Sequence, residues 1–271
     1  MGEFITYKTS SPSGDLISFL AGVRQLWVDT GKKGVVFHRL NMIGGSYEGA
    51  NHPYENDDKE PVCFNQYTFD MMRPLMLSQE YIEDYIVFDG QVHEIDLDKI
   101  RMEIFTNQPK GSLNTWMNHP FPQMTTNLAN KWLDIPKEEN GVYKDKIILN
   151  ITQRHRNAFI HYFFLKEHQG KIIFAGLQKE RNVFCNDFGL DIPLLQVDNF
   201  YELAKVINSC KFFLSNQSMC FQIAESLKIP RILEMFPMMP NVIPVGDNCP
   251  SIYHQGEIEY HFNNFIKKFY G

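Results

Sequence analysis

Apolar residues near the start of the chain follow a strand, helix and strand pattern. A short apolar run at residues 4–7 is followed by apolar side chains at positions 16, 19, 20, 23, 26 and 27. Intervals of three and four residues are typical of an amphipathic helix. Gly31 ends this helix, and the apolar run at 34–40 predicts a second strand. The order indicates the opening of a parallel sheet.

The same alternation returns in the second half of the chain. Strands are predicted over residues 146–151, 171–176, 211–215 and 230–234, with helices over 159–168, 201–209 and 221–227. Such alternation indicates right-handed crossovers and a doubly wound sheet. We therefore expect an α/β protein of two Rossmann-like domains, residues 1–130 and 131–271, whose parallel sheets face a cleft. Ligands of such folds bind at the carboxyl ends of the strands.

The remaining segments have weaker patterns. Residues 41–66, rich in Gly, Asn, Asp and Pro, are predicted to be a long loop, followed by a helix over 73–85 and a strand over 85–88. Aromatic residues recur at helical spacing near the C-terminus. They predict a closing helix that packs on a domain through Tyr260, His261, Phe262, Phe265 and Phe269.

Composition narrows the possible classes of protein. With 44% hydrophobic and 21% charged residues among 271, the chain is expected to be globular, and its net charge of -6 argues against duplex nucleic acid as a partner. Five cysteines without a CxxC pair argue against a disulfide framework and a zinc site. The first residues show no basic stretch followed by an apolar run, the pattern of a signal peptide, and no apolar segment is long enough to span a membrane. We therefore expect a cytoplasmic protein.

Three polar turns follow predicted strands and are candidates for chemistry. Gly14-Asp15 precedes the first helix, where Asp15 is either a helix cap or a general base. Thr152, Arg154 and Arg156 belong to a turn that is either a solvated basic turn or a phosphate cradle. The third turn is either a helix N-cap or a diphosphate site, and it comprises Asn216, Gln217 and Ser218.

Two familiar nucleotide motifs are missing from the sequence. It contains neither a GxGxxG fingerprint nor a Walker A loop, which argues against NAD enzymes and ATPases. His155 and His161 are not spaced as metal ligands with a carboxylate partner, so no metal is assigned.

Two stretches resemble the heptosyltransferase-like glycosyltransferases of family 9, which include the ADP-heptose:lipopolysaccharide heptosyltransferases. In that family a first strand leads to a Ser-rich loop ending in Gly-Asp, as in Ser10-Ser11-Pro12-Ser13-Gly14-Asp15 here. A later Glu-Leu-Ala helix, a strand, an Asn-Asp-Ser-Gly turn and a helix closing at Gly-x-Pro correspond to Glu202-Leu203-Ala204, 212–214, Asn216-Gln217-Ser218-Met219 and 224–230. The two matches cover about a third of the chain.

The resemblance implies a GT-B fold and transfer of a sugar from a nucleotide-sugar donor to an acceptor hydroxyl, with no metal or other cofactor. Asp15 corresponds to the family's general base. The donor would be bound by Gly14, Thr152, Arg154, Arg156, Gly176, Leu177, Asn216, Gln217, Ser218 and Gln222. The stretch at 196–199 would flank the nucleoside, and the last helix could cross back to the first domain.

Three positions depart from the family pattern. Gln217 stands where the family commonly has Asp, Met219 where it has Gly, and Gln222 where it has His. A carboxylate for sugar hydroxyls is thus lost, so the donor need not be ADP-heptose. The acceptor stays open among a glycan, a nucleobase and a small molecule. A non-catalytic GT-B-like module that binds a nucleotide or sugar is the main alternative, and a sugar-nucleotide epimerase is the third.

Overall fold

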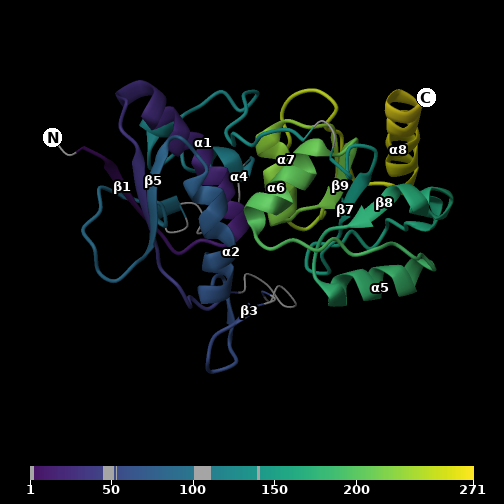
Figure 1. The fold of residues 1–271 in the computed structure, drawn as a ribbon, viewed down its shortest axis with the longest axis horizontal. Coiled ribbons are helices and arrows are strands. Elements are labelled where there is room, and N and C mark those ends of the chain that lie inside the picture. The colour runs from purple at the N-terminus through teal and green to yellow at the C-terminus, as the bar shows by residue number, and fades with distance from the viewer. Residues whose placement is uncertain (1–2, 45–51, 53, 101–110, 139–140) are drawn as a thin grey trace. The chain divides into compact units, whose positions relative to one another are not determined.

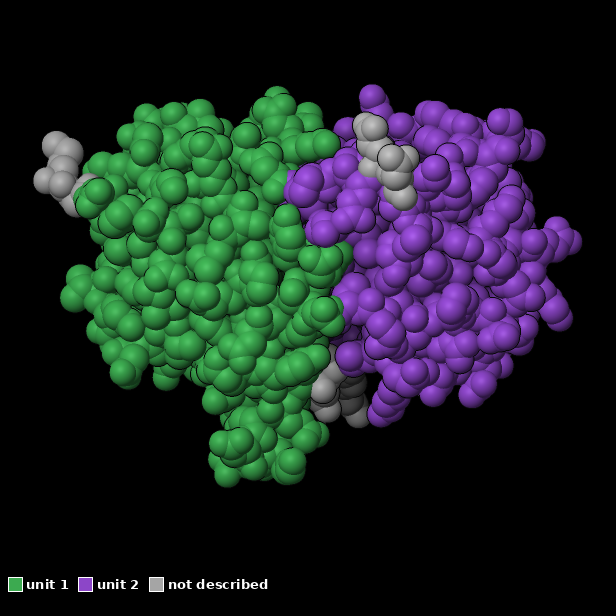
Figure 2. All heavy atoms as spheres, viewed as in Figure 1, with its two compact units in different colours: residues 1–134, 198–202 green, residues 135–197, 203–271 purple. Residues whose placement is uncertain are grey.

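The computed structural model of the chain describes residues 3–44, 52, 54–100, 111–138 and 141–271. It forms two compact units, shown in different colours in Figure 2. Unit 1 comprises residues 1–134 and 198–202, and unit 2 comprises residues 135–197 and 203–271. The sequence patterns predict a division between residues 130 and 131.

Unit 1 is built on a four-stranded sheet in the order β5-β2-β1-β6. The strands are β1 (Ile5–Thr9), β2 (Gly34–His38), β5 (Ile82–Val87) and β6 (Ile95–Asp96), and each neighbouring pair is parallel. Tyr7, Val36 and Tyr85 lie opposite one another across three strands, and all three are buried. The predicted opening of a parallel sheet is therefore confirmed.

Helices and a small hairpin complete unit 1. They are α1 (Ser13–Thr30), α2 (Gln66–Leu77), α4 (Leu113–Trp116), the 3-10 helix η2 (Pro122–Met124) and the hairpin strands β3 (Tyr54–Glu55) and β4 (Pro61–Val62). α1 packs closely on η2 and α4. The closeness is clear at Gly22, where an added Cβ would lie 2.4 Å from Met117 Sδ and 2.8 Å from Met124 Cβ. A larger residue at this position would force both methionines to move.

Two predictions for unit 1 are wrong in position. The helix expected over 73–85 is α2, which begins seven residues earlier because Asn65 Oδ1 caps it by accepting from the Thr68 amide at 3.0 Å. The loop expected over 41–66 contains the β3–β4 hairpin, whereas residues 45–51 and 53 lie outside the described residues.

Unit 2 is built on a five-stranded sheet in the order β11-β10-β9-β7-β8. Its strands are β7 (Ile147–Asn150), β8 (Ile172–Phe174), β9 (Phe212–Asn216), β10 (Arg231–Glu234) and β11 (Ser251–Ile252), all paired in parallel. Every residue of β7, β9 and β10 is buried, as expected for strands covered on both faces. The predicted α/β fold with two parallel sheets is confirmed.

The helices of unit 2 are the 3-10 helix η3 (Phe163–Lys171), α5 (Gln178–Phe188), most of α6 (Phe200–Ser209), α7 (Met219–Leu227) and α8 (Gln255–Tyr270). Residues 200–202 of α6 belong to unit 1. Figure 1 labels α5, α6, α7 and α8. α7 packs on β9 and β10, and α8 packs on β10. The helix predicted over 159–168 is wrong, since η3 begins later and is a 3-10 helix. α5 has no counterpart in the sequence analysis.

The C-terminal helix closes unit 2. Phe262 and Phe265 are buried, and their ring centroids lie 5.5 and 5.3 Å from that of Phe212 on β9. The predicted core role is confirmed for these two residues, whereas Tyr260 is exposed. Among the described residues, no helix has the length and apolar character needed to cross a membrane.

Candidate functional site

The loops that follow β7, β8, β9 and β10 leave the same edge of the unit 2 sheet, because the strands are parallel. They contain residues 151–157, 175–177, 217–218 and 235–241. Nine of the predicted site residues lie in these loops, at their strand ends or in the helix that follows β9. We call this edge the donor edge, because the sequence predicts that a nucleotide-sugar donor binds there.

Asn216, the last residue of β9, fixes the loop after β7. Its fully buried side chain accepts from the Thr152 amide at 3.0 Å and donates to the Thr152 carbonyl at 2.7 Å. The same Nδ2 donates to the His155 carbonyl at 2.8 Å. Asn216 and Thr152 are therefore brought together, with the Asn216 amide engaged by the protein backbone.

Gln217 fixes a different segment, the residues after β10. Its Nε2 donates to the Met239 carbonyl and to Asn241 Oδ1, both at 2.9 Å, and its Oε1 accepts from the Phe236 amide at 2.7 Å. These three bonds use both N–H groups and the carbonyl oxygen of a buried side chain. Gln217 thus holds Phe236–Asn241 against the turn after β9.

His155 joins the two loops. Its Nδ1 lies 2.8 Å from the Gln217 carbonyl, and its ring stacks on Phe236 at 5.7 Å between centroids. Burial, aided by the charge of Arg154, lowers the pKa of His155 to about 4. A neutral ring with Nδ1 protonated donates to the carbonyl, so His155 is a fixed support at pH 7.

The start of α7 lies directly after this turn. Ser218 is the N-cap, and its Oγ accepts from the Phe221 amide at 3.1 Å. The first amides of a helix carry partial positive charge and attract anions. Gln222, on the same helix, is 2% exposed, and neither its Nε2 nor its Oε1 has a hydrogen-bond partner in the described part of the chain.

The two arginines of the loop after β7 differ in their surroundings. Arg156 forms an ion pair with the fully buried Glu234, donates to the Ile160 carbonyl at 3.1 Å and stacks over the Tyr162 ring. Burial raises the pKa of Glu234, while Arg156 opposes this effect. Arg156 therefore anchors its loop to the core of unit 2, and a phosphate contact by Arg156 stays a prediction.

Arg154 belongs to the donor edge itself. Its charge lowers the pKa of His155 and acts against the raised pKa of Glu180, so it lies near both groups. Arg154 supplies positive charge between the end of β7 and the end of β8.

Glu180 is a site residue that the sequence analysis missed. Its Oε2 accepts from the Leu177 amide at 3.1 Å, and burial is the largest cause of its raised pKa. A Cβ on Gly176 would lie 3.1 Å from Glu180 Oε2 and 3.2 Å from Asn150 Nδ2, so the chain is tightly packed here. The available signal was that Glu180 lies four residues after Gly176, the glycine that follows β8. The sequence pattern did not predict α5, the helix that contains Glu180.

Asp15 and Gly14 lie in unit 1, in the first turn of α1 at the carboxyl end of β1. The Gly14 carbonyl accepts from Ser18 Oγ at 3.0 Å. The N-cap position belongs to Pro12, and Asp15 is the acidic residue of the first turn, where the free amides and the helix dipole favour a carboxylate. Asp15 is half-buried, a position compatible with a general base.

The loop that leads to Asp15 is fixed by a carboxylate from the end of β6. Asp98 accepts from the Ser10 amide at 2.7 Å and from Ser10 Oγ at 2.8 Å, and it pairs with Lys8 Nζ at 2.8 Å. Beside this loop the buried His38 has its Nδ1 2.7 Å from Tyr85 Oη. Burial lowers the pKa of His38 to about 3, so its ring is neutral.

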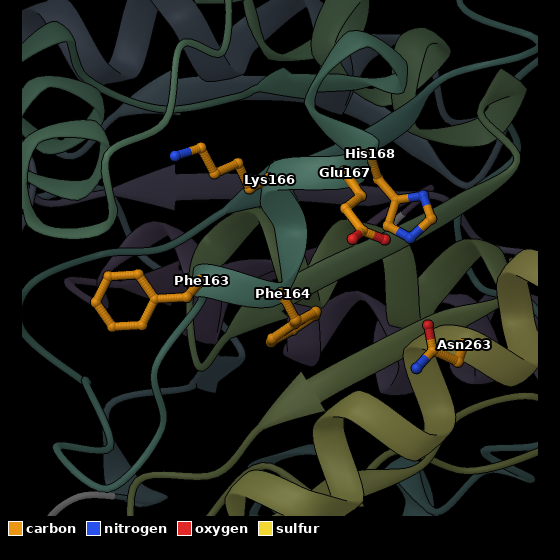
Figure 3. Close-up of a pocket in the computed structure, with 6 residues that line it drawn as sticks. All are labelled: Phe163, Phe164, Lys166, Glu167, His168 and Asn263. Carbon is orange, nitrogen blue, oxygen red and sulfur yellow. The ribbon is translucent and has the colours of Figure 1, made fainter.

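A surface pocket of about 420 Å³ lies elsewhere in unit 2. Figure 3 shows the residues that line it, all from η3 and α8: Phe163, Phe164, Lys166, Glu167, His168 and Asn263. It contains none of the predicted site residues. In the part of the chain that is described, no three His, Cys, Asp or Glu side chains form a group that could hold a metal ion.

No protein-family model matches this chain, and no curated protein matches its sequence. Solved structures do match over nearly the whole length. ADP-heptose lps heptosyltransferase II of E. coli has 11% identity, a TM-score of 0.64, and coverage of 99% of this chain and 100% of its own.

Two further matches are a family 9 glycosyl transferase from Veillonella parvula and the E. coli heptosyltransferase WaaC with ADP-2-deoxy-2-fluoro heptose. The first has 12% identity, a TM-score of 0.52 and coverage of 99% and 91%. WaaC has 10% identity, a TM-score of 0.55 and coverage of 98% and 99%. Two Rossmann-like units on parallel sheets, matched over this length, show that the chain has the GT-B-type fold of the heptosyltransferases and family 9 glycosyltransferases.

Proposed function

We propose that the protein is a glycosyltransferase that moves a sugar from a nucleotide-sugar donor to an acceptor hydroxyl, without a metal ion. The observation that carries the proposal is the donor edge of unit 2. There Arg154, the N-terminus of α7 and Glu180 follow parallel strands, and Asn216 fixes the loop that contains Arg154. Similar structures include a heptosyltransferase solved with ADP and with an ADP-heptose analogue, which supports the same ligand class here.

The leaving group of this reaction is a nucleoside diphosphate. As the bond from the anomeric carbon to the diphosphate oxygen breaks, negative charge grows on that oxygen. The charge of Arg154 and the first amides of α7 provide fixed electrostatic stabilisation for it. Loops braced by Asn216 and Gln217 need little reorganisation during the reaction, which favours this role.

The acceptor hydroxyl needs a base when its oxygen attacks the anomeric carbon. We assign this role to Asp15, whose carboxylate would take the hydroxyl proton as the new C–O bond forms. The Asp98 contacts to Ser10 fix the loop before α1, which supports a defined position for the base. The five free cysteines support a reducing compartment, in agreement with a cytoplasmic enzyme.

The experiment that tests the proposal is a thermal-shift and calorimetry panel. ADP, GDP, UDP, CDP and dTDP, with a nucleotide sugar of each, are titrated into the wild type and into Arg154→Ala. We expect one nucleotide family to bind, and Arg154→Ala to weaken this binding about tenfold or more, since a charge-assisted contact to phosphate contributes roughly 1.5–3 kcal/mol.

Arg73→Ala is the matched control. It also removes one arginine, but its partner is Asp84 on the surface of unit 1, so binding should be unchanged. Absence of binding by all nucleotides at millimolar concentration would contradict the proposal. Binding without turnover against a broad acceptor panel would instead support a non-catalytic nucleotide-binding module.

A further inference from the structure

The order of the strands gives the donor edge a direction. β7 and β9 are neighbours in the middle, with β8 beyond β7 and β10 beyond β9. The phosphate-attracting groups, Arg154 and the start of α7, follow the two middle strands. A diphosphate placed there has a nucleoside on one side and a sugar on the other, so these two parts extend toward β8 and β10 in opposite directions.

The β8 end has the chemistry expected for the nucleoside. Glu180 presents a half-buried carboxylate beside Gly176, and carboxylate oxygens accept hydrogen bonds from paired hydroxyls. The sugar end of the donor must then lie over the residues that follow β10. This direction rests on the proposed function.

The residues after β10 form a defined surface although they contain no helix or strand. Two backbone hydrogen bonds close turns within this segment. The Met239 N–H donates to the Phe236 carbonyl at 3.2 Å, and the Asn241 N–H donates to the Met239 carbonyl at 2.9 Å. Gln217 bonds to the same three residues, and His155 stacks on Phe236. Met238, at the tip, is 86% exposed.

We propose that segment 236–241 is the sugar-facing wall of the donor site and that Gln217 is its positioning residue, not a ligand of the donor. Every hydrogen-bonding group of the Gln217 amide is used on this wall. A side chain that is satisfied in this way stabilises the wall, and the side chains of Phe236 and Met238 discriminate among sugars.

The test compares two ligands that differ only in the sugar. Wild type, Gln217→Glu and Met238→Glu are titrated calorimetrically with the nucleoside diphosphate and with the nucleotide sugar selected by the panel above. Gln217→Glu keeps the size of the side chain but loses both N–H donors to Met239 and Asn241. We expect it to weaken nucleotide-sugar binding about tenfold and diphosphate binding less than about twofold, because only the wall loses preorganisation.

Met238→Glu protects the test against misfolding, because the side chain is exposed. It should reproduce the selective loss of nucleotide-sugar binding. Val142→Glu is its matched control, since Val142 is 80% exposed and lies before the amino end of β7. Hydrogen exchange of the Asn241 amide should rise in Gln217→Glu and stay unchanged in Met238→Glu. The Phe236 amide keeps its acceptor in Gln217→Glu and serves as the internal reference.

Three results overturn the inference. If Gln217→Glu loses the same affinity for both ligands, Gln217 contacts the diphosphate. If Gln217→Glu and Met238→Glu both keep wild-type affinity for the nucleotide sugar, segment 236–241 is not part of the donor site. In either case Arg154→Ala still reports on the proposed function independently. If the wild type binds no nucleotide, the proposed function and the inference fail together.

Discussion

Asn216 and Thr152, 64 residues apart in the chain, are joined by a pair of hydrogen bonds at the donor edge of unit 2. The Asn216 side chain accepts from the Thr152 amide and donates to the Thr152 carbonyl, as a neighbouring strand would. The polar turn after β9 therefore acts on the loop after β7. This link is why two short turns with common residue types form one site.

Substituting Asn216 by alanine should destabilise unit 2. The change leaves the Thr152 amide and the Thr152 and His155 carbonyls without their partner, and unpaired buried groups cost roughly 1–3 kcal/mol each. We expect a loss of about 3 kcal/mol in urea unfolding followed by circular dichroism. Asn263→Ala, an exposed change on α8, is the control and should stay within about 0.5 kcal/mol of wild type.

Arg156→Ala should lose stability at neutral pH because it leaves Glu234 buried without its cation. Breaking a buried ion pair in this way typically costs roughly 3–5 kcal/mol. Burial already raises the pKa of Glu234, and loss of Arg156 raises it further. The folded variant then binds a proton that the unfolded chain releases, so its stability falls as pH rises above the unfolded carboxyl pKa.

The deficit of Arg156→Ala relative to wild type should therefore shrink when pH is lowered from 7 to 5. Urea midpoints of both proteins at several pH values measure this difference. A deficit that is constant across the range would contradict the assigned coupling between Arg156 and Glu234.

His155 should make stability depend on pH with the opposite sign. Its folded pKa of about 4 is below the ordinary histidine value, so the folded protein binds fewer protons than the unfolded chain between these values. The contribution is fully present above about pH 6.5 and is lost as pH falls toward 4. An NMR titration of the ring, together with a shallower pH dependence of stability in His155→Gln, checks it; a ring that titrates near 6.5 would contradict it.

Asp15→Asn should abolish turnover while leaving the donor site intact. Loss of a general base reduces the rate by roughly 10²–10⁴-fold. Release of nucleoside diphosphate from the nucleotide sugar measures turnover, and calorimetry measures donor affinity. The control is Asp29→Asn, at the last turn of α1, where Asp29 accepts from Gln25 at 2.9 Å. Wild-type turnover in Asp15→Asn would remove Asp15 from the chemistry.

The parallel sheets were predictable because their strands contain short apolar runs, such as residues 147–149 and 212–214. Helices were harder. α5 has a mostly polar sequence, and only Phe184, Cys185 and Phe188 are buried, which leaves a weak periodic signal. The segment at 159–168 has an apolar spacing that suits a helix, yet Ile160 and Tyr162 are buried in irregular backbone before η3.

The position of the candidate site was predictable, but the hydrogen-bond and ion-pair partners of its side chains were not. A polar turn after a parallel strand indicates the donor edge, and Arg154, Asn216 and Ser218 lie there. The sequence could not show that Arg156 pairs with Glu234, which lies 78 positions further along the chain. Nor could it show that Gln217 bonds to residues 19–24 positions further along. Those partners follow from tertiary packing of β10 and the loop after it, which local patterns do not encode.

The most direct test of the account is a crystal structure of the protein with the nucleoside diphosphate that the binding panel selects. We expect its phosphates at the N-terminus of α7, within hydrogen-bond distance of the Met219 and Cys220 amides and beside Arg154. The ribose should lie toward Glu180. A nucleotide bound instead in the pocket between η3 and α8, or away from the donor edge altogether, would contradict the assignment of a glycosyltransferase donor site to these residues.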